Sequence, residues 1–206
     1  MRILVTRWLL TVAMIVSAAA PIKVGAQQEL AGRALVDALK HGGYVIVMRH
    51  ATTEAKPDAP SVDLANCATQ RNLVVEGRTM ARSIGGALDA MQVPLGRVIS
   101  SPFCRTRDTA DLAFGHGDTD AGLGEKAMKN PATSAEAAAA LRPLVAAPVP
   151  TGTNTIVVTH GFNIKSIVGA DFVEGEAAIF RPDGKGGFTL IARVLPLDWA
   201  KLASQK

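Results

Sequence analysis

The sequence predicts an α/β fold built on a mainly parallel β-sheet. Short apolar runs rich in β-branched residues are typical of strands buried on both faces, and three occur at 44–48, 98–99 and 155–159. Segments with helical apolar spacing alternate with these runs, at 28–40, 75–91, 102–114, 134–145 and 163–168. Two later apolar runs flank a glycine-rich turn, which predicts a hairpin of antiparallel edge strands at 178–180 and 188–194.

Local signals support the boundaries of several elements. The first helix should stop at His41, because two glycines follow it. Pro102 suits the first turn of the helix that follows the second strand. The alanine-rich helix should end before the break at 148–152. Segments 51–72 and 115–124 are rich in prolines or glycines, and we expect both to be irregular.

Polar residues stand at the carboxyl ends of the three central strands. Arg49 and His50 follow the first strand, the segment before Arg105 follows the second, and His160 follows the third. Ligands of open α/β sheets bind outside the carboxyl ends of the strands. The sequence therefore predicts a site that contains these four residues.

A phosphoryl group is the ligand that such a set suits best. Arginine offers a planar fork of donors that matches phosphate oxygens. Helix N-termini after strands add backbone N–H donors. A neutral imidazole can act as a nucleophile near pH 7. The alternative is that His50 and His160 only cap the ends of their strands.

The N-terminus has the pattern of a secretory signal peptide. Arg2 and Arg7 precede an apolar run at 8–20, and small or apolar residues at 24–26 precede a polar segment. We expect a signal peptide at 1–26, one domain at 27–206, and a periplasmic or secreted protein. The apolar run is shorter than the ~20 residues that span a bilayer. An uncleaved signal anchor remains the alternative.

The composition argues against a nucleic-acid partner. The 206 residues carry a formal charge of +4, with 22 basic and 18 acidic residues. Without Arg2, Arg7 and Lys23 of the leader, 19 basic residues remain against 18 acidic ones. The basic charge is therefore mainly a property of the leader, and aromatic residues for base stacking are few.

Cys67 and Cys104 form an even pair in the exported part, which predicts a disulfide. Two buried free thiols are the alternative. The histidines are scattered, so the sequence predicts no metal site. It also lacks a P-loop, and we expect no cofactor.

Four segments resemble, in order, the motifs of the histidine phosphatase superfamily, which has a phosphoglycerate mutase-like fold. Residues 47–52 (Val-Met-Arg-His-Ala-Thr) are similar to its Arg-His-Gly motif, with Ala51 in place of the glycine. Residues 73–81, 100–110 and 157–161 resemble its later blocks. The resemblance implies a three-layer sandwich with helices on both faces of the sheet.

The resemblance also implies roles for residues. His50 would be the nucleophile that becomes phosphohistidine, and Arg49, Arg105 and His160 would hold the phosphoryl oxygens. Asn163 is similar to the asparagine of a His-Asp-Thr-Asn pattern in the acid-phosphatase branch, which adds it to the phosphate-binding set. Gly161 stands where that branch has its acid.

The general acid must therefore lie elsewhere. Leu123-Gly124-Glu125 is similar to a Leu-x-Glu segment of the mutase-like branch, and Glu125 is our choice. The competing carboxylates are Glu174, Glu176, Asp118 and Asp120. For Arg71 and Arg107, an exposed or salt-bridged position is favoured over the phosphate pocket.

These inferences predict an exported, metal-independent phosphomonoesterase that acts through phosphohistidine. The expected substrate is a sugar phosphate or an envelope glycolipid, since the exported branch that includes the lipopolysaccharide core heptose phosphatase is the most similar subgroup. The alternatives are a non-catalytic phosphate-binding module and a peripheral membrane protein held by an uncleaved N-terminus. After cleavage we expect no membrane span, and the sequence leaves the oligomeric state open.

Overall fold

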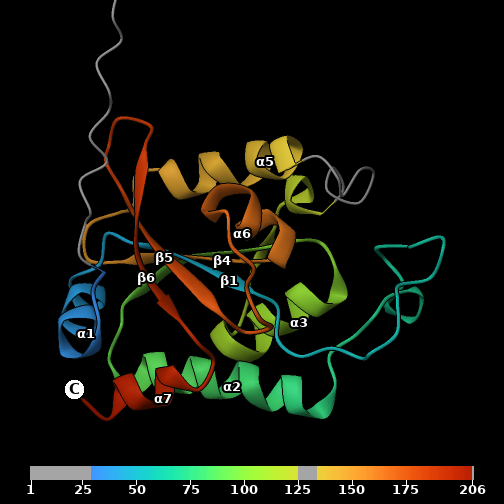
Figure 1. The fold of residues 1–206 in the computed structure, drawn as a ribbon. Coiled ribbons are helices and arrows are strands. Elements are labelled where there is room, and N and C mark those ends of the chain that lie inside the picture. Colours follow the sequence, from blue (N-terminus) through green and yellow to red (C-terminus); the bar gives the residue numbers. More distant parts are fainter. Residues whose placement is uncertain (1–28, 125–133, 206) are drawn as a thin grey trace, which may run out of the picture.

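A six-stranded sheet lies at the centre of the fold, with the strand order β3-β2-β4-β1-β5-β6. The structure is a computed structural model that describes residues 29–124 and 134–205 (Figure 1). The strands are β1 (Val45–Arg49), β2 (Leu95–Ser100), β3 (Asp118–Thr119), β4 (Asn154–Thr159), β5 (Ala177–Pro182) and β6 (Phe188–Val194). Strands β1, β2, β3 and β4 pair in parallel, whereas β5 pairs antiparallel with both β1 and β6.

Helices cover both faces of this sheet, as Figure 1 shows. One face carries α1 (Gly32–His41), α2 (Val75–Ala90), α3 (Cys104–Phe114) and α7 (Asp198–Ala203). The other face carries α5 (Ser134–Ala146) and α6 (Gly161–Val168). The predicted α/β sandwich with a mainly parallel sheet and an antiparallel edge is therefore confirmed.

Alternating residues of the central strands pack into two separate cores. Ile46 and Met48 of β1 face the layer that contains Trp199 of α7. Val45 and Val47 face the opposite layer, which contains Leu141 of α5. Both faces of β1 are buried, which explains why its sequence is a continuous apolar run rather than an alternating one.

The structure differs from the sequence prediction in several places, and the C-terminal helix α7 was not predicted. The glycine-rich segment 115–124 contains the short strand β3 and the 3₁₀ turn η2 (Ala121–Leu123). The two residues of β3 are exposed and carry no apolar pattern, so the sequence does not predict this strand. It is defined by its pairing with β2. Helix α3 begins at Cys104 rather than at Pro102, and α6 begins at Gly161, two residues before the predicted start.

The segment between β1 and α2 is irregular, as predicted, apart from the 3₁₀ turn η1 (Cys67–Thr69). The predicted disulfide between Cys67 and Cys104 is present and ties η1 to the first residue of α3. Gln70 strengthens this link, since its Oε1 accepts a hydrogen bond from the Cys104 backbone N–H at 2.9 Å. The irregular segment is therefore anchored beside Arg105.

The predicted signal peptide and Glu125 lie outside the described residues. Within the described part of the chain, no helix is long and apolar enough to cross a membrane.

Candidate active site

A pocket of about 410 Å³ opens at the carboxyl ends of β1, β2 and β4. Six cationic or imidazole side chains line it, Arg49, His50, Arg71, Arg105, His160 and Lys165, and one carboxylate, Asp171, lines it as well. Four of them are the residues that the sequence placed at strand ends. The order of the strands brings these four residues together, because β1 and β2 both pair in parallel with β4.

His50 is held as a neutral imidazole with one ring nitrogen engaged. Its side chain is only 2% exposed, and Nδ1 donates to the backbone oxygen of Ala51 at 2.9 Å. Burial, together with the charges of Arg105, Arg49 and Arg71, lowers the pKa of His50 to about 3. At neutral pH the Nε2 lone pair is therefore available for attack.

Ala51 stands where the motif that this segment resembles has a glycine, and the arrangement accommodates its methyl group. Its methyl group is fully buried against Leu73 and Ala81. Its backbone N–H donates to Thr109 Oγ1 at 3.1 Å, and that hydroxyl donates to the Arg105 backbone oxygen at 2.6 Å. Among the described residues other than glycine, only Gln92 has a positive φ, so the position of Ala51 does not require glycine.

Arg49 lies at the end of β1, and Arg105 lies in the first turn of α3, which follows β2. Strands β1 and β2 lie on either side of β4. Arg49 Nη1 donates to the backbone oxygen of Phe172 at 2.7 Å. The Arg105 guanidinium lies 4.4 Å from the centre of the Phe103 ring. The Nε atoms of both arginines are buried without a partner in the described structure, and burial lowers the pKa of each guanidinium. These unsatisfied donors suit an anionic ligand.

Arg71 enters the same pocket from the irregular segment that the disulfide anchors. Its Nε is also buried without a partner in the described part of the chain. Asp58 links the segment to the site, because one oxygen, Oδ1, accepts from the Arg71 backbone N–H at 2.7 Å and from Arg105 Nη1 at 2.9 Å. The sequence-based expectation that Arg71 is exposed or salt-bridged was wrong. Arg71 lies in an irregular segment, so no periodic pattern in the sequence located it.

His160 precedes α6 and forms the remaining wall of the pocket. Its Nε2 lies 2.9 Å from Ser101 Oγ, and its ring centre lies 5.6 Å from that of His50. Burial lowers the pKa of His160 well below its usual value, with Arg105 as the next cause. A Cβ atom at Gly161 would lie 3.3 Å from Arg49 Cδ, so an acidic side chain here would press on Arg49.

Asn163 does not line the pocket. Its side chain is fully buried in α6, and Oδ1 accepts from Thr159 Oγ1 at 2.9 Å. This bond ties the helix to the end of β4, directly before His160.

The competing carboxylates lie in four different environments. Glu174 approaches His50 and accepts two hydrogen bonds from Thr53. Glu176 is buried and paired with Arg193. Asp118 lies in the exposed edge strand β3, and Asp120 caps η2 through the Gly122 N–H. None of these four lines the pocket, and Glu125 lies outside the described residues.

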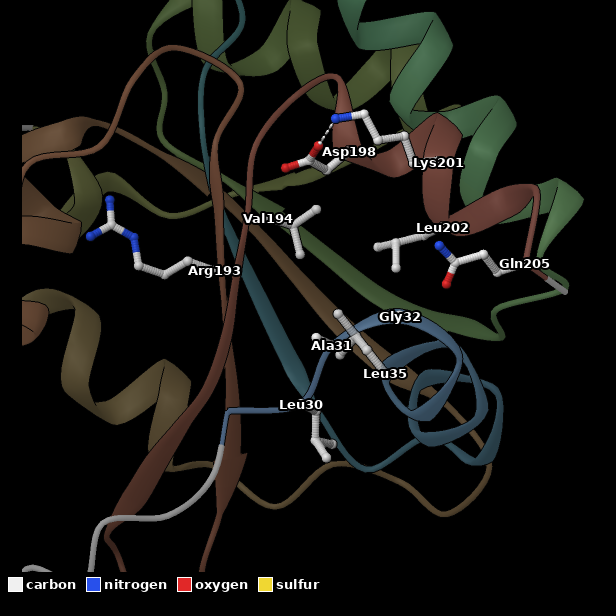
Figure 2. Close-up of a pocket in the computed structure, with 10 residues that line it drawn as sticks. All are labelled: Leu30, Ala31, Gly32, Leu35, Arg193, Val194, Asp198, Lys201, Leu202 and Gln205. Carbon is white, nitrogen blue, oxygen red and sulfur yellow. Dashed lines mark hydrogen bonds and ion pairs between the residues drawn. The ribbon is translucent and has the colours of Figure 1, made fainter.

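A second pocket, of about 230 Å³, has a different character (Figure 2). It lies between the start of α1, the end of β6 and α7, and aliphatic side chains such as Leu35 and Leu202 line it beside the Lys201–Asp198 ion pair. Figure 2 shows the Arg193 guanidinium pointing away from Leu202 and Gln205. Its described lining residues include no histidine or cysteine, so they offer neither an imidazole nor a thiol.

Among residues 29–124 and 134–205, no three histidine, cysteine or acidic side chains gather into a candidate metal site.

Residues 45–140 match the family model described as "Histidine phosphatase superfamily (branch 1)". These findings support a place in the histidine phosphatase superfamily. The match contains His50, Arg71 and Arg105 and ends before His160. No curated protein matches the chain. The family match supports a phosphatase.

Several solved phosphatase structures share the fold of this chain. The protein histidine phosphatase SixA in complex with tungstate is 22% identical, with a TM-score of 0.51 over 75% of this chain and 98% of SixA. A phosphoserine phosphatase from Entamoeba histolytica is 15% identical, with a TM-score of 0.53 over 74% of this chain and 97% of the enzyme. A mycobacterial glucosyl-3-phosphoglycerate phosphatase is 16% identical, with a TM-score of 0.53 over 71% of this chain and 96% of the enzyme.

Proposed function

We propose that this protein is an exported phosphomonoesterase in which His50 carries the phosphoryl group as phosphohistidine. The observation that carries the proposal is the state of His50. It is buried and neutral, its Nδ1 is engaged by Ala51, and it faces a pocket walled by three arginines.

In the proposed reaction, Nε2 of His50 attacks phosphorus and its lone pair forms the N–P bond. The P–O bond of the ester breaks in line, and its electron pair leaves with the alcohol oxygen, which takes a proton from a carboxylic acid. Water then attacks phosphorus, the N–P electron pair returns to Nε2, and the same carboxylate accepts the proton from water. Inorganic phosphate is released.

Four side chains would stabilise the phosphoryl oxygens during both steps. Arg49, Arg71 and Arg105 supply positive charge, and His160 lies beside His50. Fixed donors of this type contribute roughly 10²–10³ in rate each. Because the arginines supply the charge, the scheme needs no metal ion. Asn163 would act through its bond to Thr159, which supports the position of His160.

Glu125 is the proposed acid. Two of the competing carboxylates are already engaged elsewhere: Glu176 by Arg193, and Asp120 by the N-terminus of η2. Glu174 lies near the engaged nitrogen of His50 rather than near the leaving group. An alcohol is a poor leaving group, so loss of the acid should cost roughly 10²–10⁴ in rate for alkyl phosphates.

Export is the part of the proposal that rests on the leader at 1–26 and on the disulfide, since disulfides persist mainly in oxidising compartments. An exported enzyme would meet envelope sugar phosphates and glycolipid phosphates rather than cytosolic intermediates. A panel of sugar phosphates, nucleotides, phosphoserine, phosphohistidine and envelope glycolipids would identify the substrate.

Turnover of p-nitrophenyl phosphate tests the chemistry, because its good leaving group makes the acid less important. We expect turnover by the native protein, phosphohistidine trapped by an alkaline quench, and loss of both in His50→Ala. His41→Ala is the matched control, since His41 lies at the exposed end of α1. Phosphate binding with no His50-dependent turnover would instead favour a non-catalytic phosphate-binding module.

A further inference from the structure

Glu174 lies behind the proposed nucleophile. It belongs to the segment between α6 and β5, which returns to the end of β1. Oε1 accepts from Thr53 Oγ1 at 2.8 Å, and Oε2 accepts from the Thr53 N–H at 3.3 Å. Oε1 also lies 3.5 Å from Arg49 Nη2 and 3.9 Å from His50 Nδ1.

The carboxylate of Glu174 lies on the Nδ1 side of the His50 ring. In an in-line reaction, the attacking Nε2 and the departing oxygen lie on opposite sides of phosphorus. A group beside Nδ1 is therefore on the wrong side to protonate the leaving oxygen. Glu174 is also the only carboxylate within 4.0 Å of a His50 nitrogen among the described residues.

Phosphorylation changes the charge of the His50 ring. When the Nε2 lone pair forms the N–P bond, Nδ1 keeps the proton that it donates to Ala51. The imidazole thus gains a positive charge in a buried place.

Of the other charged or titratable groups that line the pocket with His50, Arg49, Arg71, Arg105, His160 and Lys165 do not favour this charge, and Asp171 is paired with Lys165. Burial, together with the charges of the three arginines, lowers the pKa of the unphosphorylated His50 to about 3, which shows that this site disfavours a positive ring. Among the described residues, Glu174 is the carboxylate that lies within 4.0 Å of a ring nitrogen of His50.

We propose that Glu174 is the counter-charge of the phosphorylated His50 imidazole, and that Thr53 holds it in place. The inference rests on the proposed function. Glu174 acts through His50 and is a positioning residue, because it does not contact the phosphoryl group or the leaving oxygen. Its carboxylate stabilises the phosphoenzyme and the transition state that leads to it.

Rapid mixing with p-nitrophenyl phosphate, followed by an alkaline quench, measures the rate and extent of phosphohistidine formation. In Glu174→Gln the side chain keeps its shape and an oxygen for Thr53 but loses its charge. We expect phosphorylation to slow by roughly 10- to 100-fold. We expect the dissociation constant of inorganic phosphate to stay the same or fall, since a negative charge beside Arg49 is removed.

A structural role would change both measurements together, so slower phosphorylation with equally weakened phosphate binding overturns the proposal. Unchanged phosphorylation in Glu174→Gln also overturns it.

Glu174→Asp, which retains the charge, should recover part of the rate. Glu54→Gln, the same change in the neighbouring segment, should match the native protein, and thermal unfolding checks that each variant is folded. If the native protein forms no phosphohistidine, the proposed function itself fails, which is a different result from native phosphorylation without an effect of Glu174→Gln.

Discussion

At the scale of single residues, burial decides the protonation of His50 and His160. Both imidazoles lie inside the protein among arginines, and each has a lowered pKa for that reason. The proposed nucleophile, His50, and the neighbouring His160 therefore remain neutral across the range in which a free histidine would titrate.

This depressed pKa predicts how stability depends on pH. Below about pH 6.5 the unfolded chain takes up protons on these imidazoles, whereas the folded protein keeps His50 neutral down to about pH 3. The stability contribution is therefore complete above pH 6.5 and is lost as the pH falls towards 3. Between pH 6.5 and 5.5 we expect the free energy of unfolding to drop by about 1 kcal/mol for each buried histidine.

Urea unfolding at the two pH values measures this drop. His50→Gln should show a smaller pH dependence than the native protein, whereas His41→Gln, at the exposed end of α1, should not. An equal pH dependence in His50→Gln and the native protein would contradict the prediction.

Arg71 gives a second prediction at this scale. Its Nε is buried and has no hydrogen-bond partner among the described residues, which favours a direct contribution to anion binding. We expect Arg71→Ala to weaken inorganic phosphate binding by about tenfold, which titration calorimetry would measure. Arg78→Ala is the control, because Arg78 is paired with Asp108 between α2 and α3 and does not line the pocket. Equal affinities in Arg71→Ala and the native protein would remove Arg71 from the site.

At the scale of elements, the disulfide connects an irregular segment to the helix that presents Arg105. Cys67 lies in η1 and Cys104 is the first residue of α3. The hydrogen bonds of Gln70 and Asp58 reinforce the same contact. The segment that this link anchors therefore brings Arg71 into the pocket and Asp58 to Arg105.

Opening the disulfide should loosen the pocket. The bridge closes a loop with a sequence separation of 37 residues, for which chain entropy predicts about 4 kcal/mol of stabilisation. We expect Cys67→Ser to lower the free energy of unfolding by about 2–4 kcal/mol and to weaken phosphate binding. Reduced native protein should behave like Cys67→Ser, and reductant should not affect Cys67→Ser further. Phosphate affinity that is insensitive to both changes would show that the segment holds its place without the bridge.

Close packing of elements also explains why position 77, within the motif-like segment 73–81, is a glycine. A Cβ atom at Gly77 in α2 would lie only 2.0 Å from the Thr52 backbone oxygen. Only glycine lets α2 approach the segment that follows His50 so closely. The two motifs around residues 50 and 77 are thus parts of one contact.

At the scale of the whole molecule, parallel pairing brings distant segments to one edge of the sheet. β1 and β2 both lie beside β4, so residues near positions 50, 105 and 160 meet in one pocket. The two faces of the sheet are covered by separate cores, which leaves the carboxyl ends of the strands for the site.

Export is a prediction at this scale. We expect the protein recovered from the periplasm or culture medium to begin at Gln27, as N-terminal sequencing would determine. Cleavage would remove three basic residues and leave a nearly neutral chain. A protein that retains Met1 or its leader in the membrane fraction would support the signal anchor instead.

Much of the fold was readable from the sequence because it follows from local patterns. Runs such as 44–48 and 155–159 are apolar throughout, as strands covered on both faces must be. The polar residues that follow these strands could be grouped because parallel strands end at a common edge. The short strand β3 could not be predicted, since its two residues are exposed and it exists only through pairing with β2.

The sequence by itself determined the central strands, the helices other than α7, and the set of Arg49, His50, Arg105 and His160, since periodicity and strand ends are local properties of the chain. Only the tertiary structure placed Arg71 in the pocket and Glu174 behind His50. Both residues lie in irregular segments, whose positions depend on contacts between distant parts of the chain. Glu174 meets Thr53 across a separation of 121 residues, and no periodic pattern encodes such a contact.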